Sequence, residues 1–207
     1  MMEKFMTKNL YDLSKTKAKQ LLESCAYPWE TLPKIGEYII SLGSMLDEEI
    51  YEKKGENIWI AKNAEIAQTA SITGPAIIGE NAQVRHCAFI RGNALVGDNA
   101  VVGNCTELKN VILFDNVQVP HYNYVGDSIL GYKAHMGASS IASNVKSDKK
   151  LVIVRDGDVR NRNWTKKVWS NDRRQCRNWL WCGIKPRHSN RKRVKYISTF
   201  CSPRLCP

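Results

Sequence analysis

Arg91, Lys109 and His121 are residue types that can bind a phosphate and move a proton. Their positions in the chain differ by multiples of six. Two cations that lie side by side can share a phosphate through charge-assisted hydrogen bonds. A histidine titrates near neutral pH and can act as a general base. The alternative is two solvated surface charges and a histidine that is structural or merely exposed. The choice depends on whether the fold brings these residues together.

The sequence around these residues repeats every six positions. An aliphatic residue or phenylalanine begins ten consecutive units: Ile60, Ile66, Ile72, Ile78, Val84, Ile90, Val96, Val102, Leu108 and Phe114. A small residue follows four places later in most units: Ala64, Ala70, Ala76, Ala82, Ala88, Ala94, Ala100 and Thr106. Neither an α-helix nor a period-two strand keeps this step, whereas hexapeptide repeats build parallel β-helices. We therefore predict a mainly β solenoid with three faces, the aliphatic residues inside and the small residues at the corners.

A β-helix turn of about 18 residues would stack Arg91 and Lys109 on adjacent turns of one face. Each occupies the second, outward place of its six-residue unit. Adjacent turns are separated by the strand spacing of roughly 4.8 Å. Two cations at that distance repel by about 1 kcal/mol even in a water-like dielectric. An anion between them would relieve the repulsion, and a phosphate is the simplest candidate.

The six-residue step is interrupted in the stretch VPHYNYVGDSILGYKAHMGASS, residues 119–140. The step resumes from Leu130 in a shifted phase, and His121, Tyr124 and Asp127 lie within the interruption. A coil that departs from its repeat is expected to extrude a loop, and loops on rigid scaffolds often carry function. We therefore predict a loop that brings His121 beside the basic pair.

Residues 60–145 resemble the left-handed β-helix acetyltransferase domain of the bacterial bifunctional N-acetylglucosamine-1-phosphate uridyltransferase family. The resemblance lies in VGNCTELKN and in VPHYNYVGDSILGYKAHMGASSI. The family segments read like GN-x-x-E-x-K, H-x-x-Y-x-GD and NIGAGTI-x-x-N-Y. The spacings that separate Arg91, Lys109, His121 and Tyr124 are those of the family. This resemblance implies a left-handed parallel β-helix, an acetyl-CoA-dependent acyltransferase and a homotrimer whose active sites form between subunits.

The resemblance also implies a role for each matching residue. Arg91 and Lys109 would hold the phosphate of an amino-sugar phosphate such as glucosamine 1-phosphate. His121 would take a proton as the sugar amine attacks the acetyl-CoA thioester. Tyr124 would line the sugar site. Such a reaction belongs to UDP-N-acetylglucosamine biosynthesis and cell-wall precursor synthesis.

Three positions near the expected acceptor pocket depart from the family pattern. His135 stands where the family has asparagine, GASS replaces GAGT, and Val145 replaces the tyrosine that follows Asn144. The resemblance implies that Asn144 and His135 contact the acceptor, and that the Ala138 backbone lies near the acyl donor. The substitutions leave another sugar nucleotide or a small amine open as the acceptor. A non-catalytic trimeric scaffold or regulatory module is a further alternative.

The chain carries no sign of a metal site, a membrane span or a disulfide framework. None of His86, His121 and His135 lies within a few positions of another, so they do not match the three-histidine zinc sites of γ-carbonic-anhydrase-like β-helices. No apolar run reaches about 18 residues, residues 1–19 do not read as a secretory signal, and seven cysteines show no paired spacing. We expect no metal in the β-helix, no nucleic-acid or membrane partner, and a cytoplasmic protein.

Three segments differ in composition. Residues 1–55 form an expected helical segment, with helices at 9–24 and 29–43 and with Pro33 delaying or kinking the second. Residues 56–158 form the expected β-helix. Residues 159–207 are a basic tail with 14 of the 31 lysines and arginines of the chain and one of its 20 acidic residues. The net charge of +11 therefore belongs to the tail.

We interpret the tail as further hexapeptide coils translated in an altered reading frame. It holds four of the six tryptophans. The only tryptophan codon becomes a glycine codon after a shift of one base, and suitable codons then restore a hexapeptide pattern. The chain as written would thus lack coils that complete the acyl-donor site, and the basic charge of the tail is no sign of nucleic-acid binding. Resequencing the gene around the codon of Asp158 tests this, because an unbroken frame contradicts it.

Overall fold

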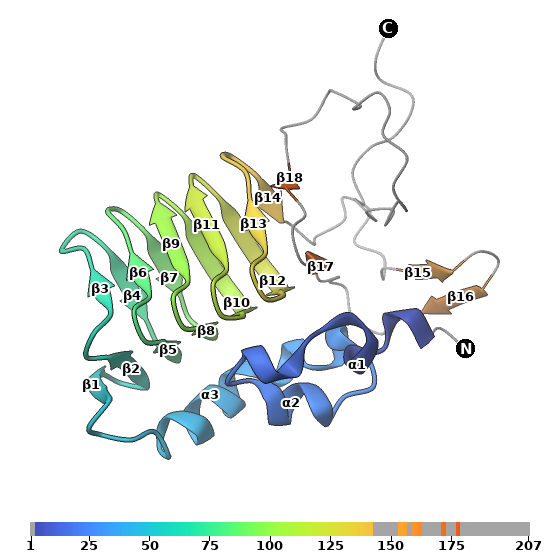
Figure 1. Ribbon diagram of the computed structural model, residues 1–207, viewed down its shortest axis with the longest axis horizontal. Helices are drawn as coiled ribbons and strands as arrows, with labels where there is room; N and C mark the ends of the chain where they lie inside the picture. The colour runs from blue at the N-terminus through green and yellow to red at the C-terminus, as the bar shows by residue number, and fades with distance from the viewer. Residues whose placement is uncertain (1–2, 143–152, 157–158, 163–170, 173–176, 179–207) are drawn as a thin grey trace, which may run out of the picture.

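The computed structural model describes residues 3–142, 153–156, 159–162, 171–172 and 177–178. Short helices precede a parallel β-solenoid of about five turns (Figure 1). The fold is mainly β, as the repeat predicts. The helical elements are η1 (Glu3–Phe5), α1 (Thr7–Leu10), η2 (Leu13–Lys15), α2 (Lys19–Glu23), η3 (Pro28–Glu30), η4 (Leu32–Lys34) and α3 (Ile35–Gly43).

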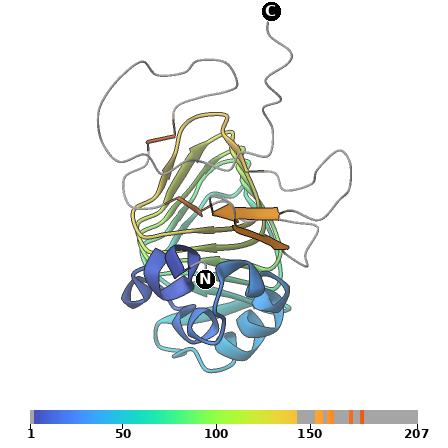
Figure 2. The same cartoon turned by 90° about the vertical axis from the view of Figure 1, so that its right-hand side faces the viewer.

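The strands form three faces that meet in a triangular cross-section (Figure 2). Face 1 consists of β4 (Ser71–Thr73), β7 (Phe89–Arg91), the first halves of β10 (Glu107–Leu113) and β12 (Tyr124–Leu130), and β14 (Ile141–Ala142). Face 2 consists of β2 (Ile58–Ala61), β5 (Ala76–Ile78), β8 (Ala94–Val96), the second halves of β10 and β12, and β17 (Asn171–Asp172). Face 3 consists of β3 (Glu65–Ile66), β6 (Gln83–Val84), β9 (Val101–Asn104), β11 (Gln118–His121), β13 (His135–Met136) and β18 (Arg177–Asn178). Two antiparallel pairings complete the set: β1 (Tyr51–Gly55) with β2, and β15 (Ile153–Asp156) with β16 (Val159–Arg162).

Up to Leu108, the repeat places its residues as predicted. Inward side chains from all three faces fill the centre of the coil and are buried from the second turn onward: Ile78, Val84, Ile90, Val96, Val102 and Leu108. The prediction for Phe114 is wrong, because Leu113 pairs with Val96 in its place and the Phe114 ring lies 5.2 Å from the ring of Tyr11. The small residues at the corners are buried as well: Ala76, Ala82, Ala88, Ala94, Ala100 and Thr106. A larger side chain at these corners would overpack a core that has no room to expand.

The shift of phase comes from a shortened corner and not from a loop. Leu108 pairs with Ile90, three six-residue units earlier, whereas the step from Ala94 to its partner Val111 is one residue shorter. One residue is therefore lost at the corner between faces 1 and 2. The next turn loses a second residue at the same corner, because Val111 pairs with Ser128, which is again one residue short of three six-residue units.

The predicted loop around His121 is consequently wrong. His121 is the last residue of β11 and pairs with Asn104, and Tyr124 begins β12. The corner can be one residue shorter because the strand after it keeps its register. Val111 and Leu113 still pair with Ala94 and Val96 and face inward, so no loop is needed.

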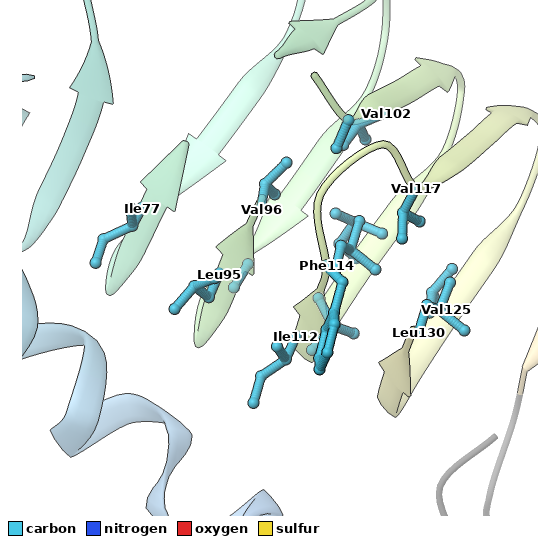
Figure 3. Close-up of a cluster of buried hydrophobic side chains, with 14 of the residues drawn as sticks. Ile77, Leu95, Val96, Val102, Ile112, Phe114, Val117, Val125 and Leu130 are labelled. Atoms are coloured by element: carbon cyan, nitrogen blue, oxygen red, sulfur yellow. The ribbon is translucent and has the colours of Figure 1, made fainter. Parts of the chain in front are cut away.

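Face 2 is buried on both sides because the N-terminal helices cover it. Ile77, Leu95 and Ile112 lie in register on adjacent turns and are fully buried. They point out of the coil toward the helices, as Figure 3 shows, and α3 contacts β5, β8 and β10. Parallel strands that are buried on both faces carry continuous apolar runs, which explains why face 2 departs from alternation.

The helical segment is more broken than its sequence pattern suggests. The predicted helix at 9–24 is divided into α1, η2 and α2, and Asp12 accepts a hydrogen bond from the Ser14 backbone N–H between them. The predicted helix at 29–43 begins at Ile35, two residues after Pro33, as the proline requires. The close approach of α3 to the coil explains Gly43, because a Cβ atom there would overlap the ring of Trp59.

An ion pair of Lys17 connects the helical segment to the corner between faces 2 and 3. Its ammonium group donates to Asp98 Oδ2 at 2.6 Å, and Asp98 also accepts the Glu80 backbone N–H at 2.8 Å. Burial lowers the pKa of Lys17, but the hydrogen bond to Asp98 and the neighbouring Tyr51 outweigh burial and raise that pKa. Burial raises the pKa of Tyr51 as well. Lys17 therefore stays charged and Tyr51 neutral at neutral pH.

The Ile112→Ala substitution tests the packing of face 2 against the helices. The variant should lose about 2–5 kcal/mol of unfolding free energy, because it opens a cavity in a fully buried layer. Ile141→Ala is the matched control, since Ile141 is 67% exposed and should change the free energy by less than about 0.5 kcal/mol. Urea unfolding measures both. Equal losses would contradict the packing described above.

Alkaline unfolding tests the Lys17 contact. The raised pKa means that the folded protein keeps this proton where the unfolded chain begins to lose it. The stabilisation is therefore complete below the ordinary lysine value of 10.5 and is lost as pH rises through the raised pKa. Lys17→Met should weaken the fall in the urea midpoint above about pH 10.5, while Lys19→Met, at an exposed lysine, should leave it unchanged. An unaltered pH profile in Lys17→Met would refute this role.

Candidate functional site

Arg91 and Lys109 lie on adjacent turns of face 1, as predicted. Arg91 ends β7, and Lys109 follows Leu108, which pairs with Ile90. Each cation contacts a carboxylate of the chain. Arg91 Nη1 lies 2.7 Å from Glu107 Oε1, and Lys109 Nζ lies 3.4 Å from Asp127 Oδ2. These carboxylates offset the repulsion between the cations, so a bound anion is not needed to hold them together.

Asp127 and Asn110 form the shortened corner between faces 1 and 2. Both have left-handed backbone conformations, with φ of 46° and 55°. Asparagine and aspartate tolerate this conformation better than most residues. The Asn110 Nδ2 donates to Asp127 Oδ1 at 2.9 Å, and the Asp127 side chain is 8% exposed. Asp127 is therefore a buried anchor that fixes the corner and orients Lys109.

Tyr124 lies beside the cations on the next turn of face 1. It pairs with Glu107, and Gly126 pairs with Lys109. A Cβ atom on Gly126 would lie 2.6 Å from the Tyr124 hydroxyl oxygen. The ring of Tyr124 thus extends over Gly126 toward the row of Lys109, and only glycine leaves space for it.

His121 lies at the edge where face 3 meets face 1. Its backbone N–H donates to Asn123 Oδ1 at 3.1 Å, and its carbonyl accepts the Ser139 N–H at 3.0 Å. Asn123 is buried, and its Nδ2 donates to the Gly137 carbonyl at 2.7 Å. The imidazole is exposed, but the backbone of His121 is fixed by hydrogen bonds to Asn123 on its own turn and to Ser139 on the next turn. Tyr122 and Asn123 separate His121 from Tyr124, so the candidate base and the two cations occupy adjoining faces.

The remaining predicted residues divide into those near this edge and those outside the described structure. The shorter step that pairs Gln118 with His135 places Ala138 on the turn after His121, and Ala138 is exposed. His135 begins the same stretch of face 3, and its Nδ1 lies 3.1 Å from Gln118 Oε1. Asn144 lies outside the described residues.

Three residues of the site were not predicted from the sequence: Glu107, Asn110 and Asn123. Glu107 lies two residues before Lys109, so it shares the outward side of β10 with that lysine. This spacing could have identified it. The partners of Asn110 and Asn123 lie on the next turn and depend on the shortened step, which the sequence does not reveal. Within the described part of the chain, no group of three histidines, cysteines or carboxylates could hold a metal ion, and no helix is long and apolar enough to span a membrane.

Part of the chain is similar in sequence to known proteins. A family model described as the GMPPB C-terminal domain matches residues 72–162. Bifunctional protein GlmU from Methanococcus maripaludis (strain C5) is 45% identical over 49 residues. The GlmU proteins of Methanococcus aeolicus and Methanocaldococcus jannaschii are 43% and 41% identical over the same length. The chain is thus similar to these proteins over part of its length.

The described coil fits a GlmU-like hexapeptide-repeat acetyltransferase domain. Each GlmU match covers 24% of this chain and 12% of the relative, so the chain spans a small part of those proteins.

Two carboxylate substitutions distinguish the buried anchor from the surface pair. Asp127→Ala should cost about 1–3 kcal/mol of unfolding free energy, because it leaves buried hydrogen-bond donors without their acceptor. Glu107→Ala should cost about 0–1 kcal/mol, because the Arg91–Glu107 pair is largely exposed to solvent. Urea unfolding at fixed salt compares them. A Glu107 variant as unstable as the Asp127 variant would contradict this assignment.

Proposed function

We propose that this protein is an acetyl-CoA-dependent N-acetyltransferase whose acceptor is an amino-sugar phosphate such as glucosamine 1-phosphate. The observation that carries the proposal is the row of Arg91, Lys109 and Tyr124 on adjacent turns of face 1, next to the edge that bears His121. Two cations suit a phosphate, and a phenol beside them suits a sugar ring. The GlmU matches support the same reading.

The phosphate would bind by replacing a carboxylate of the chain. Arg91 is 48% exposed and its partner Glu107 is 32% exposed. A phosphate can compete for this guanidinium because it offers more charge and fixed acceptor geometry. Lys109 is held by the buried Asp127 and would contribute a positioned charge. The sugar would then extend over Tyr124 toward the edge with face 3.

His121 would remove the proton that the amine must lose during acyl transfer. The amine nitrogen attacks the thioester carbon, the carbon–sulfur bond breaks, and the departing sulfur of coenzyme A takes up the proton from the imidazolium to leave as the thiol. The imidazole can take the ammonium proton because it is exposed at an edge that the sugar would cross. Its backbone is fixed by Asn123 and Ser139, which limits the positions that the ring must search.

The split of the site across two faces favours completion by a second subunit. His121 and Ala138 lie at the end of face 3, and the cations lie on face 1. In a homotrimer, a neighbouring coil would close the open side over acetyl-CoA and exclude water. We place this reaction in UDP-N-acetylglucosamine biosynthesis in the cytoplasm.

A non-catalytic scaffold is the second candidate. The carboxylates that already neutralise Arg91 and Lys109 favour it, because a structural ion-pair ladder needs such partners and no ligand. In that case the two pairs would stabilise the coil, and His121 would have no chemical role.

The His121→Ala substitution separates the two candidates. Thiol release from acetyl-CoA with glucosamine 1-phosphate should fall by about 10²–10⁴-fold in kcat if His121 is the general base. His86→Ala is the matched control, because His86 is an exposed histidine of the same face two turns earlier and should retain the full rate. The assay should include both the chain as written and a form with the reading frame of the tail restored. Equal rates for the two variants would remove His121 as the base. No thiol release with any amino sugar would favour the scaffold.

A further inference from the structure

Two cysteines lie on adjacent turns at the corner between faces 3 and 1. Cys87 and Cys105 are separated by three six-residue units and occupy equivalent corner positions. Their backbone conformations are alike and left-handed, with φ of 58° and 51°. Both side chains are exposed and both thiols are free. Cysteine has no special tolerance for this conformation, so the corner geometry alone does not explain the pair.

Backbone hydrogen bonds hold the two turns together around this pair. The Cys105 N–H donates to the His86 carbonyl at 3.2 Å, and the Phe89 N–H donates to the Thr106 carbonyl at 2.9 Å. Turns joined in this way are separated by about 4.7–4.9 Å. A disulfide needs a Cα–Cα separation of about 4.4–6.8 Å. The similar φ values also direct the two Cβ atoms to the same side of the coil.

Neither thiol is committed to a strong interaction in the described structure. Cys87 Sγ lies 4.0 Å from Thr69 Oγ1, and Cys105 Sγ lies 3.5 Å from Asn104 Oδ1. Thiols are weak hydrogen-bond donors, and exposed side chains change rotamer within nanoseconds. Rotation about χ1 can therefore turn each sulfur toward the other, and a small inward shift of the two corners would bring the Cβ atoms within the roughly 3.5–4.5 Å that a disulfide needs.

We propose that Cys87 and Cys105 form a redox-sensitive dithiol that closes to a disulfide across one turn of the coil. The oxidant is a low-molecular-weight disulfide such as oxidised glutathione. The thiolate of one cysteine attacks this disulfide, its sulfur–sulfur bond breaks, and one small thiol leaves. The thiolate of the other cysteine then attacks the mixed disulfide and releases the second small thiol. The two protein thiols supply two electrons, and their protons end on the two released thiols.

The disulfide would fix the turn that precedes the candidate base. Tyr122 occupies the equivalent corner position on the following turn, with φ of 51°. Its N–H donates to the Asn104 carbonyl at 2.9 Å, and Asn104 pairs with His121. Closure between Cys87 and Cys105 would therefore stiffen the support of the His121 edge. Its occurrence does not depend on the proposed acetyltransferase activity.

Trypsin makes the proposed bond directly visible in the full chain. Cleavage after Arg85, Arg91 and Lys109 releases peptides 86–91 and 92–109, each with one of the two cysteines. After exposure to oxidised glutathione, alkylation of free thiols and digestion, mass spectrometry should find these peptides joined. The joined species should exceed every other cysteine pair by about tenfold, because neighbouring thiols have a high effective concentration. Dithiothreitol should return both peptides to the free form.

A matched variant distinguishes pairing from separate oxidation. In Cys105→Ser, peptide 86–91 should carry glutathione, since the second thiol that displaces it is gone. Unreacted Cys25, which is buried, provides the internal reference for a protected thiol. The proposal is overturned if the unaltered chain shows only separate glutathione adducts at Cys87 and Cys105. It is also overturned if either cysteine joins equally well to the tail cysteines, which are Cys176, Cys182, Cys201 and Cys206.

Discussion

The hydrogen bonds between successive turns set the positions of the candidate residues that the structure describes. Each turn of the coil donates to and accepts from the next, so a residue has fixed neighbours one turn before it and one turn after it. The stacked cations of face 1, the Asn110–Asp127 corner and the paired cysteines all follow from this arrangement. A side chain in such a coil is constrained less by its neighbours in sequence than by those one turn above and below.

The sequence predicts the coil well because a short repeat leaves few ways to bury its aliphatic residues. The three faces, the inward side chains and the adjacency of Arg91 and Lys109 all follow from the six-residue step. The shortened corner could not be predicted from this step. A break in the repeat looks the same in the sequence whether the structure forms a loop or a shorter corner there. For the same reason the sequence misplaced His121 in a loop. The divided helices at 9–24 show a different limit, since packing against face 2 and the Asp12 cap override helical spacing.

Ion pairs occur on two different sides of the coil. Where the helices cover the coil, Lys17 binds Asp98 at a corner that also holds Asp115. On face 1, Glu107 and Asp127 of the coil neutralise Arg91 and Lys109. The Lys17–Asp98 pair is partly buried, with side chains 23% and 28% exposed, whereas the Arg91–Glu107 side chains are 48% and 32% exposed. A charged ligand would therefore reach the Arg91–Glu107 pair more readily.

The shortened corner has a consequence for how such coils change over time. In an ordinary strand, removing one residue turns every following side chain to the opposite face. Here one residue is lost at this corner on each of two successive turns, near Asn110 and near Asp127, yet Leu113 stays aligned with Val96 and Leu130 with Leu113. A gene for this coil can therefore lose a single codon at a corner and still encode the same interior. Deletions would be tolerated at the edge between faces 1 and 2 and rejected within the faces, so lineages of such proteins should differ in length by single residues at this corner.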